Sequence, residues 1–331
     1  MVSLSQVRAS NSLISSTFPE KLVAVFVGGT SGIGEETAKS LAKYAKNPRI
    51  YIAGRSRDAG DRVLAECKRI NPAGQYIFCK SDVSLIRGAD ELCNEIKKEE
   101  KSINILVLSS GVSDFSRTVT SEGLHLLAAL NYYSRIRIIQ NLIPLVAQAP
   151  FFRRIVSIGG GGHEGSLDTS DFQALKVPME NLREHLSTLV TLGLQGVARS
   201  SPEVSIVHCY PGTVKTPLLK NMPEEMLKTL TFVPLEETGE RHLYLATSSK
   251  YSPLKNASIA IPLGDGVEVS LGSGGQAGGV YSIRQDGENA TPEIMQKLAD
   301  LRTSGVMEEV WSHTQEEFAR IEKGYGGSVE V

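Results

Sequence analysis

The sequence predicts an α/β protein built on a doubly wound parallel sheet of the Rossmann kind, with a helical insertion and an extended C-terminal segment. Three observations predict it. Apolar runs of strand length alternate with segments of helical periodicity from Leu22 to about residue 212. The strand segments are almost continuously apolar, as in strands that are buried on both faces. A glycine-rich turn joins the first strand to the first helix.

The elements follow one another in βαβ order. In the first half we expect strands at 22–29, 49–54 and 75–83, and helices at 35–46, 58–70 and 84–100. In the second half we expect strands at 103–110, 153–160 and 204–212, separated by a helix at 124–146 and one ending at Leu194. Strands that alternate with helices in this way are typical of a parallel sheet covered on both faces.

We expect a tail at residues 1–21 and one dinucleotide-binding domain at 22–331. Short helices at about 217–258 form an insertion on the substrate side, and a glycine-rich stretch at 264–283 contains a strand. A single final helix begins at Thr291 and runs past Ile321. It lies in a C-terminal extension at about 285–331.

Composition argues against several classes of protein. The 331 residues carry a net charge of −2, without the basic excess of a nucleic-acid-binding protein. No apolar run reaches the roughly 18–20 residues of a membrane span, and the N-terminus lacks the pattern of a signal peptide. The four cysteines are far apart, so we expect buried thiols and no metal site. We therefore predict a cytoplasmic protein without nucleic-acid or membrane partners.

The glycine-rich turn predicts a phosphate-binding loop. Gly28, Gly32 and Gly34 stand between the first strand and the first helix in GxxxGxG spacing. Glycine lets the backbone approach an anion closely, and the N-terminus of the following helix stabilises a pyrophosphate. The alternative is a tight turn that holds no ligand.

Further motifs accompany this turn in order along the chain. Asp82 and Val83 follow the third strand, LVLSSG spans 106–111, Asn131 lies in a helix and PGTVKT spans 211–216. On these motifs the chain resembles the short-chain dehydrogenase/reductase superfamily over about residues 22–218. The resemblance implies that Asp82 contacts adenine, that Asn131 is an active-site residue, and that residues 211–216 contact the nicotinamide. Residues 108–110 depart from the family's Asn-Asn-Ala.

Arg55 and Ser56 indicate the cofactor. About 20 residues beyond the loop, an enzyme that uses NAD usually presents an acidic side chain to the ribose 2′-hydroxyl. A guanidinium beside a hydroxyl suits the 2′-phosphate of NADP instead, although a solvated surface arginine is the alternative. The expected cofactor-binding residues are Gly28, Thr30, Ser31, Gly32, Ile33, Gly34, Arg55, Ser56, Asp82, Val83, Ser109, Ser110, Gly111, Pro211, Gly212, Val214 and Thr216.

The residues that carry catalysis in the resembled family are missing. That family uses a serine at the end of the fifth strand and a YxxxK pair on the next helix. Alignment of these segments places Gly160, Pro178 and Leu182 at the three positions. A positioned general acid contributes about 10²–10⁴-fold to proton transfer, so another group has to act or the chemistry has to differ.

Four residues are candidates for a catalytic role: Asn131, His163, His185 and Tyr210. We expect His185 on the helix face of Pro178 and Leu182. His163 follows the fifth strand, at the edge where such sheets bind ligands, and Tyr210 directly precedes the nicotinamide loop. The alternatives are helix packing for His185, a solvated loop for His163 and a pocket wall for Tyr210.

Three hypotheses about function follow. The first is a divergent NADPH-dependent oxidoreductase of a small organic substrate, and a resemblance to fungal chains that lack YxxxK suggests secondary metabolism. The second is a cyclase, isomerase or pericyclase that uses the fold for a non-redox reaction. The third is a non-catalytic NADP-binding protein. The resemblance also implies a homodimer paired through the helix that ends at Leu194.

Overall fold

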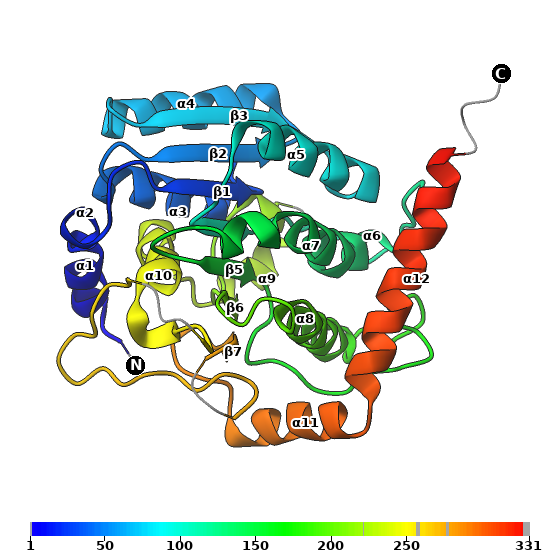
Figure 1. Cartoon of the computed structure of the whole chain (residues 1–331). Coiled ribbons are helices and arrows are strands. Elements are labelled where there is room, and N and C mark those ends of the chain that lie inside the picture. Colours follow the sequence, from blue (N-terminus) through cyan, green and yellow to red (C-terminus); the bar gives the residue numbers. More distant parts are fainter. Residues whose placement is uncertain (1, 221, 256–258, 276–277, 327–331) are drawn as a thin grey trace.

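A seven-stranded, wholly parallel sheet forms the centre of the protein in the computed structural model, which describes residues 2–220, 222–255, 259–275 and 278–326 (Figure 1). The strands lie in the order β3-β2-β1-β4-β5-β6-β7. Their bounds are β1 (Val23–Val27), β2 (Arg49–Gly54), β3 (Gln75–Lys80), β4 (Ile105–Leu108), β5 (Arg154–Ile158), β6 (Ser205–Cys209) and β7 (Val280–Ile283). The predicted doubly wound parallel sheet is confirmed.

Helices cover both faces of the sheet (Figure 1). One face carries α1 (Leu4–Ser12), α2 (Ile14–Thr17), α3 (Gly32–Tyr44), α4 (Arg57–Ile70) and α10 (Leu235–Thr247). The other carries α5 (Ile86–Glu99), α6 (Leu126–Ala128), the π-helix η1 (Ala129–Tyr133), α7 (Ser134–Ala147), α8 (Leu182–Ala198), α11 (Pro292–Thr303) and α12 (Val306–Gly326). The short helices η2 (Pro217–Leu219), α9 (Glu224–Lys228) and η3 (Ser249–Tyr251) lie in connections.

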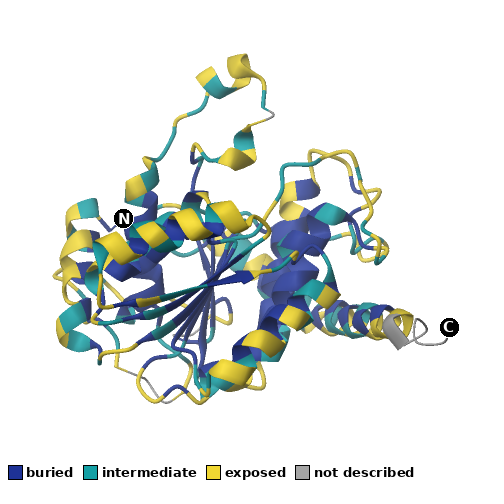
Figure 2. Cartoon of the chain, turned by 90° about the horizontal axis from the view of Figure 1, so that it is seen from above, coloured by how far each residue is buried: buried dark blue, intermediate teal, exposed yellow. Residues whose placement is uncertain are grey.

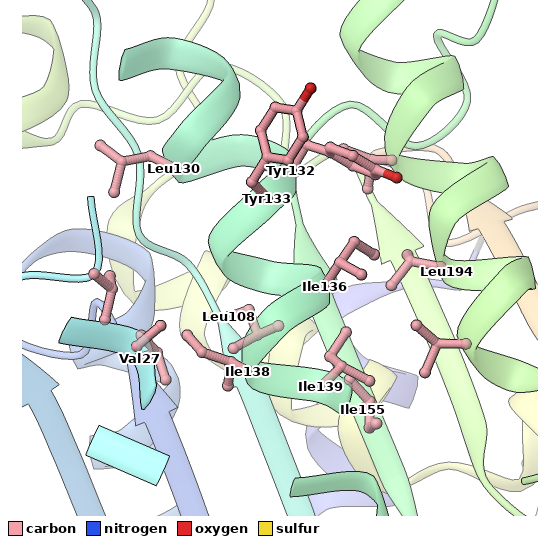
Figure 3. Packing of buried hydrophobic residues seen from close by; sticks show 14 of the residues in the cluster. Val27, Leu108, Leu130, Tyr132, Tyr133, Ile136, Ile138, Ile139, Ile155 and Leu194 are labelled. Carbon is pink, nitrogen blue, oxygen red and sulfur yellow. The ribbon is translucent and has the colours of Figure 1, made fainter. Parts of the chain in front are cut away.

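The apolar strands are buried because both layers of helices pack on them. β4, β5 and β6 are buried along their whole length, and Figure 2 shows the sheet as the dark, buried centre of the molecule. On the α7 and α8 face, Leu108, Ile136, Ile155 and Leu194 belong to one continuous apolar cluster (Figure 3). The near-continuous apolar runs in the sequence are explained by this burial.

The strand order reverses direction between β1 and β4. The chain builds β1, β2 and β3 toward one edge, returns to place β4 on the other side of β1, and continues outward to β7. Loops that leave the carboxyl ends of β1 and β4 therefore run in opposite directions and open a crevice between them. In sheets of this kind the crevice is where ligands bind.

The two chain ends contain more separate helices than the sequence indicated. Within the segment predicted as an N-terminal tail, α1 and α2 form, and Asn11 donates from Nδ2 to the Glu240 carboxylate on α10 at 2.7 Å. The final helix is two helices, α11 and α12, because Gly305 adopts φ +86° between them. That left-handed conformation favours glycine and ends α11, which lets the chain turn.

Within the expected helix 124–146 and the glycine-rich stretch, regular structure is also less continuous than predicted. Residues 129–133 form the π-helix η1 between α6 and α7. Among the residues of 264–275 and 278–283, which the structure describes, Val280–Ile283 are the ones that form a strand, β7, at the edge of the sheet. Short π-helical turns are frequent at functional sites, and η1 contains Asn131.

The described part of the chain has no helix that is both long enough and apolar enough to span a membrane. The four cysteine thiols are free and buried, as expected. Burial raises the pKa of each thiol to about 12, so the thiolate form is strongly disfavoured. Among the described residues no group of histidine, cysteine and carboxylate side chains is arranged to hold a metal ion.

His242 on α10 makes the fold sensitive to acid. Its Nδ1 lies 2.7 Å from the Thr238 carbonyl oxygen, whereas its Nε2 is buried without a partner. Burial lowers the pKa of His242 to about 4 from an ordinary value of 6.5. Between pH 6.5 and 4 the His242 imidazole binds a proton in the unfolded chain but not in the folded protein. The free energy of unfolding therefore falls by about 3 kcal/mol over this range.

Urea unfolding of the wild type and of His242→Leu between pH 7.5 and 4 measures this effect. We expect the wild type to lose about 3 kcal/mol more than the variant over that range. Parallel pH profiles for the two proteins would show that His242 does not carry the sensitivity.

Candidate cofactor cleft and active site

A cleft with a free volume of about 350 Å³ lies at the carboxyl ends of β1, β2, β3 and β4. Its walls contain thirteen of the predicted cofactor residues: Gly28, Thr30, Ser31, Gly32, Ile33, Gly34, Arg55, Asp82, Val83, Ser109, Ser110, Gly111 and Thr216. The other four, Ser56, Pro211, Gly212 and Val214, do not line it. The structure therefore brings most of these residues together, although they come from five separate connections.

The glycine turn lets three segments meet at the start of α3. Gly28 adopts φ +85°, and a Cβ there would lie 2.5 Å from the Ser110 backbone nitrogen. A Cβ on Gly34 would lie 2.2 Å from the Ser109 hydroxyl oxygen. Side chains at these positions would push the β4 loop away from the helix N-terminus. The glycines thus hold the floor of the cleft close to the free N–H groups of α3, as a bound pyrophosphate requires.

Two basic side chains line the cleft, Arg55 after β2 and Lys220 after η2. Arg55 is exposed and makes no salt bridge with a described residue, whereas the nearby Arg62 is paired with Glu35 at 2.6 Å. Ser56 caps α4, because its hydroxyl accepts from the Ala59 backbone N–H at 3.2 Å. An unpaired guanidinium suits a phosphate group at this end of the cleft.

Ser110 is a second sign that a polar ligand fits the cleft. Its hydroxyl oxygen is buried in the wall and has no hydrogen-bond partner in the described structure. By contrast, the neighbouring Ser109 hydroxyl donates to the Gly28 carbonyl oxygen at 3.1 Å. Buried hydroxyls without partners are rare, so a ligand group at Ser110 would satisfy this one.

The PGTVKT loop reaches the cleft through Thr216 only. Thr216 packs on Gly32, where a Cβ would lie 3.0 Å from the threonine methyl. Gly212 adopts φ +79°, and Val214 is buried and bridges to Val233 in the segment before α10. These contacts hold the loop over the start of α3. The segment with η2 and α9 continues from it and contains no buried residue among those described.

The alignment that placed Pro178 and Leu182 on a helix was wrong for Pro178. The helix α8 begins at Leu182, and Pro178 lies in the preceding loop, next to the Val177 carbonyl that accepts from Arg117. A loop from 166 to 181 therefore precedes α8. Pro178 and the pair Asn181 and Glu184, three residues apart, are sequence signals for this boundary that the alignment did not use.

The face of α8 that points to the edge of the sheet carries Arg183, Ser187 and Thr191. Arg183 lies 5.7 Å from the centre of the Tyr210 ring, Ser187 packs on Gly160, and Thr191 contacts His208. These residues are spaced by four along the helix. Sequence reasoning missed them, because it placed His185 on this face.

His185 and Asn131 both have partners within the protein. His185 is 1% exposed, accepts from the Asp168 backbone N–H at 3.2 Å and lies 3.3 Å from the Phe172 carbonyl. Its structural role is to hold the loop that precedes α8. Asn131 is half-buried in η1, and its Nδ2 donates to the Leu127 carbonyl oxygen at 2.8 Å.

His163 and Tyr210 meet at the carboxyl ends of β5 and β6. Their ring centres lie 4.5 Å apart, with the rings nearly perpendicular at 88°. Both are partly exposed, and the Arg183 guanidinium stands over the Tyr210 ring. Burial and the positive charge of Arg183 lower the pKa of His163. The imidazole is therefore neutral at pH 7, beside a phenol and a fixed cation.

Comparison with known proteins decides the family. A family model described as short chain dehydrogenase matches residues 22–227, which is more than half of the chain. The chain belongs to the short-chain dehydrogenase family. The protein named oxidoreductase andH of Emericella variicolor is 36% identical over 334 residues, covering 97% of this chain and 98% of its own. Oxidoreductase AN1596 of Emericella nidulans is 37% identical over 332 residues, covering 95% and 97%.

A solved structure with the same fold is the RhlG/NADP active-site complex of Pseudomonas aeruginosa. It has a TM-score of 0.56 at 18% identity, and the match covers 76% of this chain and 98% of that one. The family match and the fungal relatives make this chain an oxidoreductase of the short-chain dehydrogenase family. A nicotinamide cofactor belongs to that chemistry, and the glycine-lined cleft fits one.

A buried polar network lies below His163 and Tyr210, at the carboxyl ends of β5 and β6, and sequence reasoning did not find it. We call this end of the two strands in this short-chain dehydrogenase the active-site edge. Glu164 accepts from the Thr191 and Ser282 hydroxyls, each at 2.6 Å, and from the Gly162 backbone N–H at 2.9 Å. His208 Nε2 accepts from the Gly160 backbone N–H at 3.1 Å, and its Nδ1 lies 2.8 Å from the Thr191 hydroxyl.

These contacts fix the chemical state of the network. Because Nε2 of His208 accepts from Gly160, Nδ1 is the ring nitrogen that can donate to the Thr191 hydroxyl, which in turn donates to Glu164. Burial alone would raise the pKa of the Glu164 carboxyl, but the hydrogen bonds and His208 hold it below its usual value. The network thereby fixes the glycine loop 159–162 from below.

Proposed function

We propose that this oxidoreductase uses NADPH to reduce a small organic substrate and that Tyr210 supplies the proton. The observation that carries the proposal is the arrangement along one edge of the sheet. A glycine-lined cleft has the unpaired Arg55 among its walls, and the Tyr210, His163 and Arg183 cluster lies farther along the same edge. A hydride donor and a proton donor are thus provided for, without a YxxxK pair.

NADPH is favoured over NADH by charge. Arg55 lines the cleft after β2, where the resemblance places the 2′ position of the adenosine ribose. No acidic side chain follows β2 there, since residues 54–56 are Gly, Arg and Ser. The RhlG structure, which has the same fold, is an NADP active-site complex.

Tyr210 is favoured as the proton donor by its surroundings. NADPH supplies the hydride when it is bound, and the substrate atom that gains negative charge then needs a proton. His163 is largely neutral at pH 7 and so has little proton to give. The phenol of Tyr210 carries an O–H that can donate, and the Arg183 cation beside the ring stabilises negative charge on the substrate during transfer.

The assay for this function follows NADPH absorbance and product together. The probes are 9,10-phenanthrenequinone, cinnamaldehyde and 3,4-dihydroisoquinoline, which represent ketones, enals and imines. We expect one reduced product for each NADPH oxidised with at least one probe. Absence of NADPH oxidation with all three would contradict the proposal.

Replacing Arg55 with Glu tests the choice of cofactor. A lost charge-assisted contact costs about 1.5–3 kcal/mol, so the Kd for NADPH should rise by at least about tenfold. The Kd for NADH, which has no 2′-phosphate, should change by less than about threefold. Both constants are measured by titrating cofactor fluorescence.

Arg69→Glu is the matched control for this experiment. Arg69 is exposed at the far end of α4, and its replacement with Glu changes the net charge by the same amount as Arg55→Glu. It should leave both constants unchanged. Equal weakening of NADPH and NADH by Arg55→Glu would refute the assignment of the 2′-phosphate to Arg55.

A non-redox reaction in the same pocket is the alternative that the same assay separates, because it predicts product without loss of NADPH. A non-catalytic NADP-binding protein predicts a tight Kd for NADPH and no product. We also retain as proposals a role in fungal secondary metabolism, a cytoplasmic location and the domain limits given above.

A homodimer remains part of the proposal as well. The resemblance implies pairing through α8, and α12 of the same chain lies along that helix, where a Cβ on Gly196 would be 2.6 Å from the Trp311 ring. Because α12 covers part of α8, pairing through α8 would use the part of α8 that α12 leaves uncovered or would require α12 to move. Light scattering of the full chain measures the oligomeric state.

A further inference from the structure

Gly160, at the end of β5, has no side chain because Ser187 occupies its space. A Cβ built on Gly160 would lie 2.0 Å from the Ser187 hydroxyl oxygen and 3.1 Å from the Ser187 Cβ. No real pair of atoms tolerates the first distance without a bond. The hydroxyl from α8 therefore stands where a side chain on the strand would begin.

The Ser187 hydroxyl has no partner within the described protein. The residue is 4% exposed, and its hydroxyl makes no hydrogen bond with any described residue. Its neighbours on the same helix face differ, since Thr191 is bonded to Glu164 and Arg183 lies over Tyr210. A nearly buried hydroxyl that is left unpaired at the active-site edge is available to a ligand.

The surroundings hold this hydroxyl in place. Gly160 is fixed by its N–H bond to His208, and a hydrogen bond from His163 N to the Gly160 carbonyl at 3.0 Å closes the loop above it. Ser187 lies one helical turn beyond Arg183 and one turn before Thr191. The hydroxyl thus lies on a rigid helix, on the same side of the sheet edge as Tyr210.

We propose that Ser187 is the substrate-orienting hydroxyl of this enzyme, supplied from α8 in place of the missing serine at the end of β5. Its ligand is a hydrogen-bond acceptor on the substrate: the carbonyl oxygen or imine nitrogen bonded to the carbon that receives hydride. The Ser187 hydroxyl donates to that atom and holds it for protonation by Tyr210. This role rests on the proposed function.

Because Gly160 and Ser187 share one space, the hydroxyl can be moved from the helix to the strand, and three variants test this. Ser187→Ala removes the hydroxyl. Gly160→Ser adds one on the strand but collides with Ser187. The double variant Gly160→Ser with Ser187→Ala removes the 2.0 Å collision, leaves a tight 3.1 Å contact between the two Cβ atoms, and places a single hydroxyl on the other element. All three are assayed with the probe that the wild type reduces, and NADPH Kd and thermal midpoint are measured for each.

We expect Ser187→Ala to lower kcat by at least about tenfold, the order that one lost oriented donor causes, with NADPH Kd and thermal midpoint unchanged. Gly160→Ser should lower both kcat and the thermal midpoint. The double variant should recover kcat to within about fivefold of the wild type and should recover the midpoint. Recovery of kcat distinguishes an orienting hydroxyl from a packing role, which would restore the midpoint alone.

Three outcomes would overturn the inference. An unchanged kcat in Ser187→Ala, in an enzyme that oxidises NADPH with a probe, removes the role of Ser187 and leaves the proposed function intact. Recovery of the midpoint without recovery of kcat in the double variant does the same. A wild type that oxidises NADPH with none of the probes removes the proposed function, and the orienting role with it.

Discussion

Replacing Tyr210 with Phe lowers kcat for reduction of 9,10-phenanthrenequinone by about 10²–10⁴-fold, the contribution of a positioned general acid. The phenyl ring still fills the space beside His163 and Arg183, so the Kd for NADPH and the thermal midpoint should not change. Single-turnover NADPH oxidation at saturating substrate isolates the reduction step and measures the loss directly.

The chemistry of the acceptor provides an internal control. An N-methylated 3,4-dihydroisoquinolinium ion already carries a positive charge, and its reduction needs hydride but no proton. We therefore expect Tyr210→Phe to change its kcat by less than about fivefold. Tyr76→Phe removes a hydroxyl that bonds the Asn71 carbonyl outside the cleft and should change neither reaction. Equal losses for the quinone and the cation would contradict the role of Tyr210.

The pH profile separates Tyr210 from His163. Because burial lowers the pKa of His163 below 6.5, a protonated His163 would become more abundant as the pH falls from 8 to 6. If that ring donated the proton, kcat would rise steadily over this range. We expect instead a level kcat, the same in the wild type and in His163→Gln, because the proposed donor is not His163.

Replacing Glu164 with Leu should lower the free energy of unfolding by about 3–5 kcal/mol. The substitution leaves the Thr191 and Ser282 hydroxyls buried without their acceptor and leaves the Gly162 N–H with only the Ser282 hydroxyl oxygen, at 2.7 Å. Each such group costs about 1–3 kcal/mol. Because Gly162 belongs to the loop below the active site, kcat should fall as well. Denaturant unfolding at pH 7 measures the stability.

Two further variants calibrate this result. Glu164→Gln keeps one acceptor oxygen and should lose less stability than Glu164→Leu. Glu184→Leu removes an exposed carboxylate that accepts from the Ser166 N–H at 3.1 Å, and should cost less than about 1 kcal/mol. Losses of similar size at positions 164 and 184 would show that the network does not hold the loop.

The pH dependence has a defined sign. Glu164 has a lower pKa in the folded protein than in the unfolded chain, so its contribution is complete above the ordinary value of 4.5. It is lost as the pH falls through the lowered value. The difference in stability between the wild type and Glu164→Gln should therefore be constant from pH 8 to 5 and shrink below 4.5.

The cofactor cleft could be predicted from sequence because its parts are local. An apolar run predicts each strand, and the residues that follow a strand lie at the carboxyl edge of any parallel sheet. Gly28 and Gly34 can be recognised in the sequence because the residues after β4 come so close that no side chain fits at these two positions. Thirteen of the seventeen predicted cofactor residues line the cleft for this reason.

The active-site edge could not be predicted in the same way. Arg183 and Ser187 face it because of how α8, which begins at Leu182, packs against β5 and β6, and that packing is not a property of the local sequence. His185, which the sequence suggested, points to that loop instead. Pro211, Gly212 and Val214 match a motif, but the loop reaches the cleft only at Thr216.

By itself the sequence determined the parallel sheet, the position of the phosphate loop and the absence of a YxxxK pair, because apolar periodicity, glycine spacing and residue identity are properties of short segments. Only the tertiary structure decided which side chains lie beside Gly160 and Tyr210 at the carboxyl ends of β5 and β6. Ser187 lies 27 positions after Gly160 and His208 lies 21 after Ser187. Their contact depends on how α8 packs across β5 and β6, which is set by the whole core.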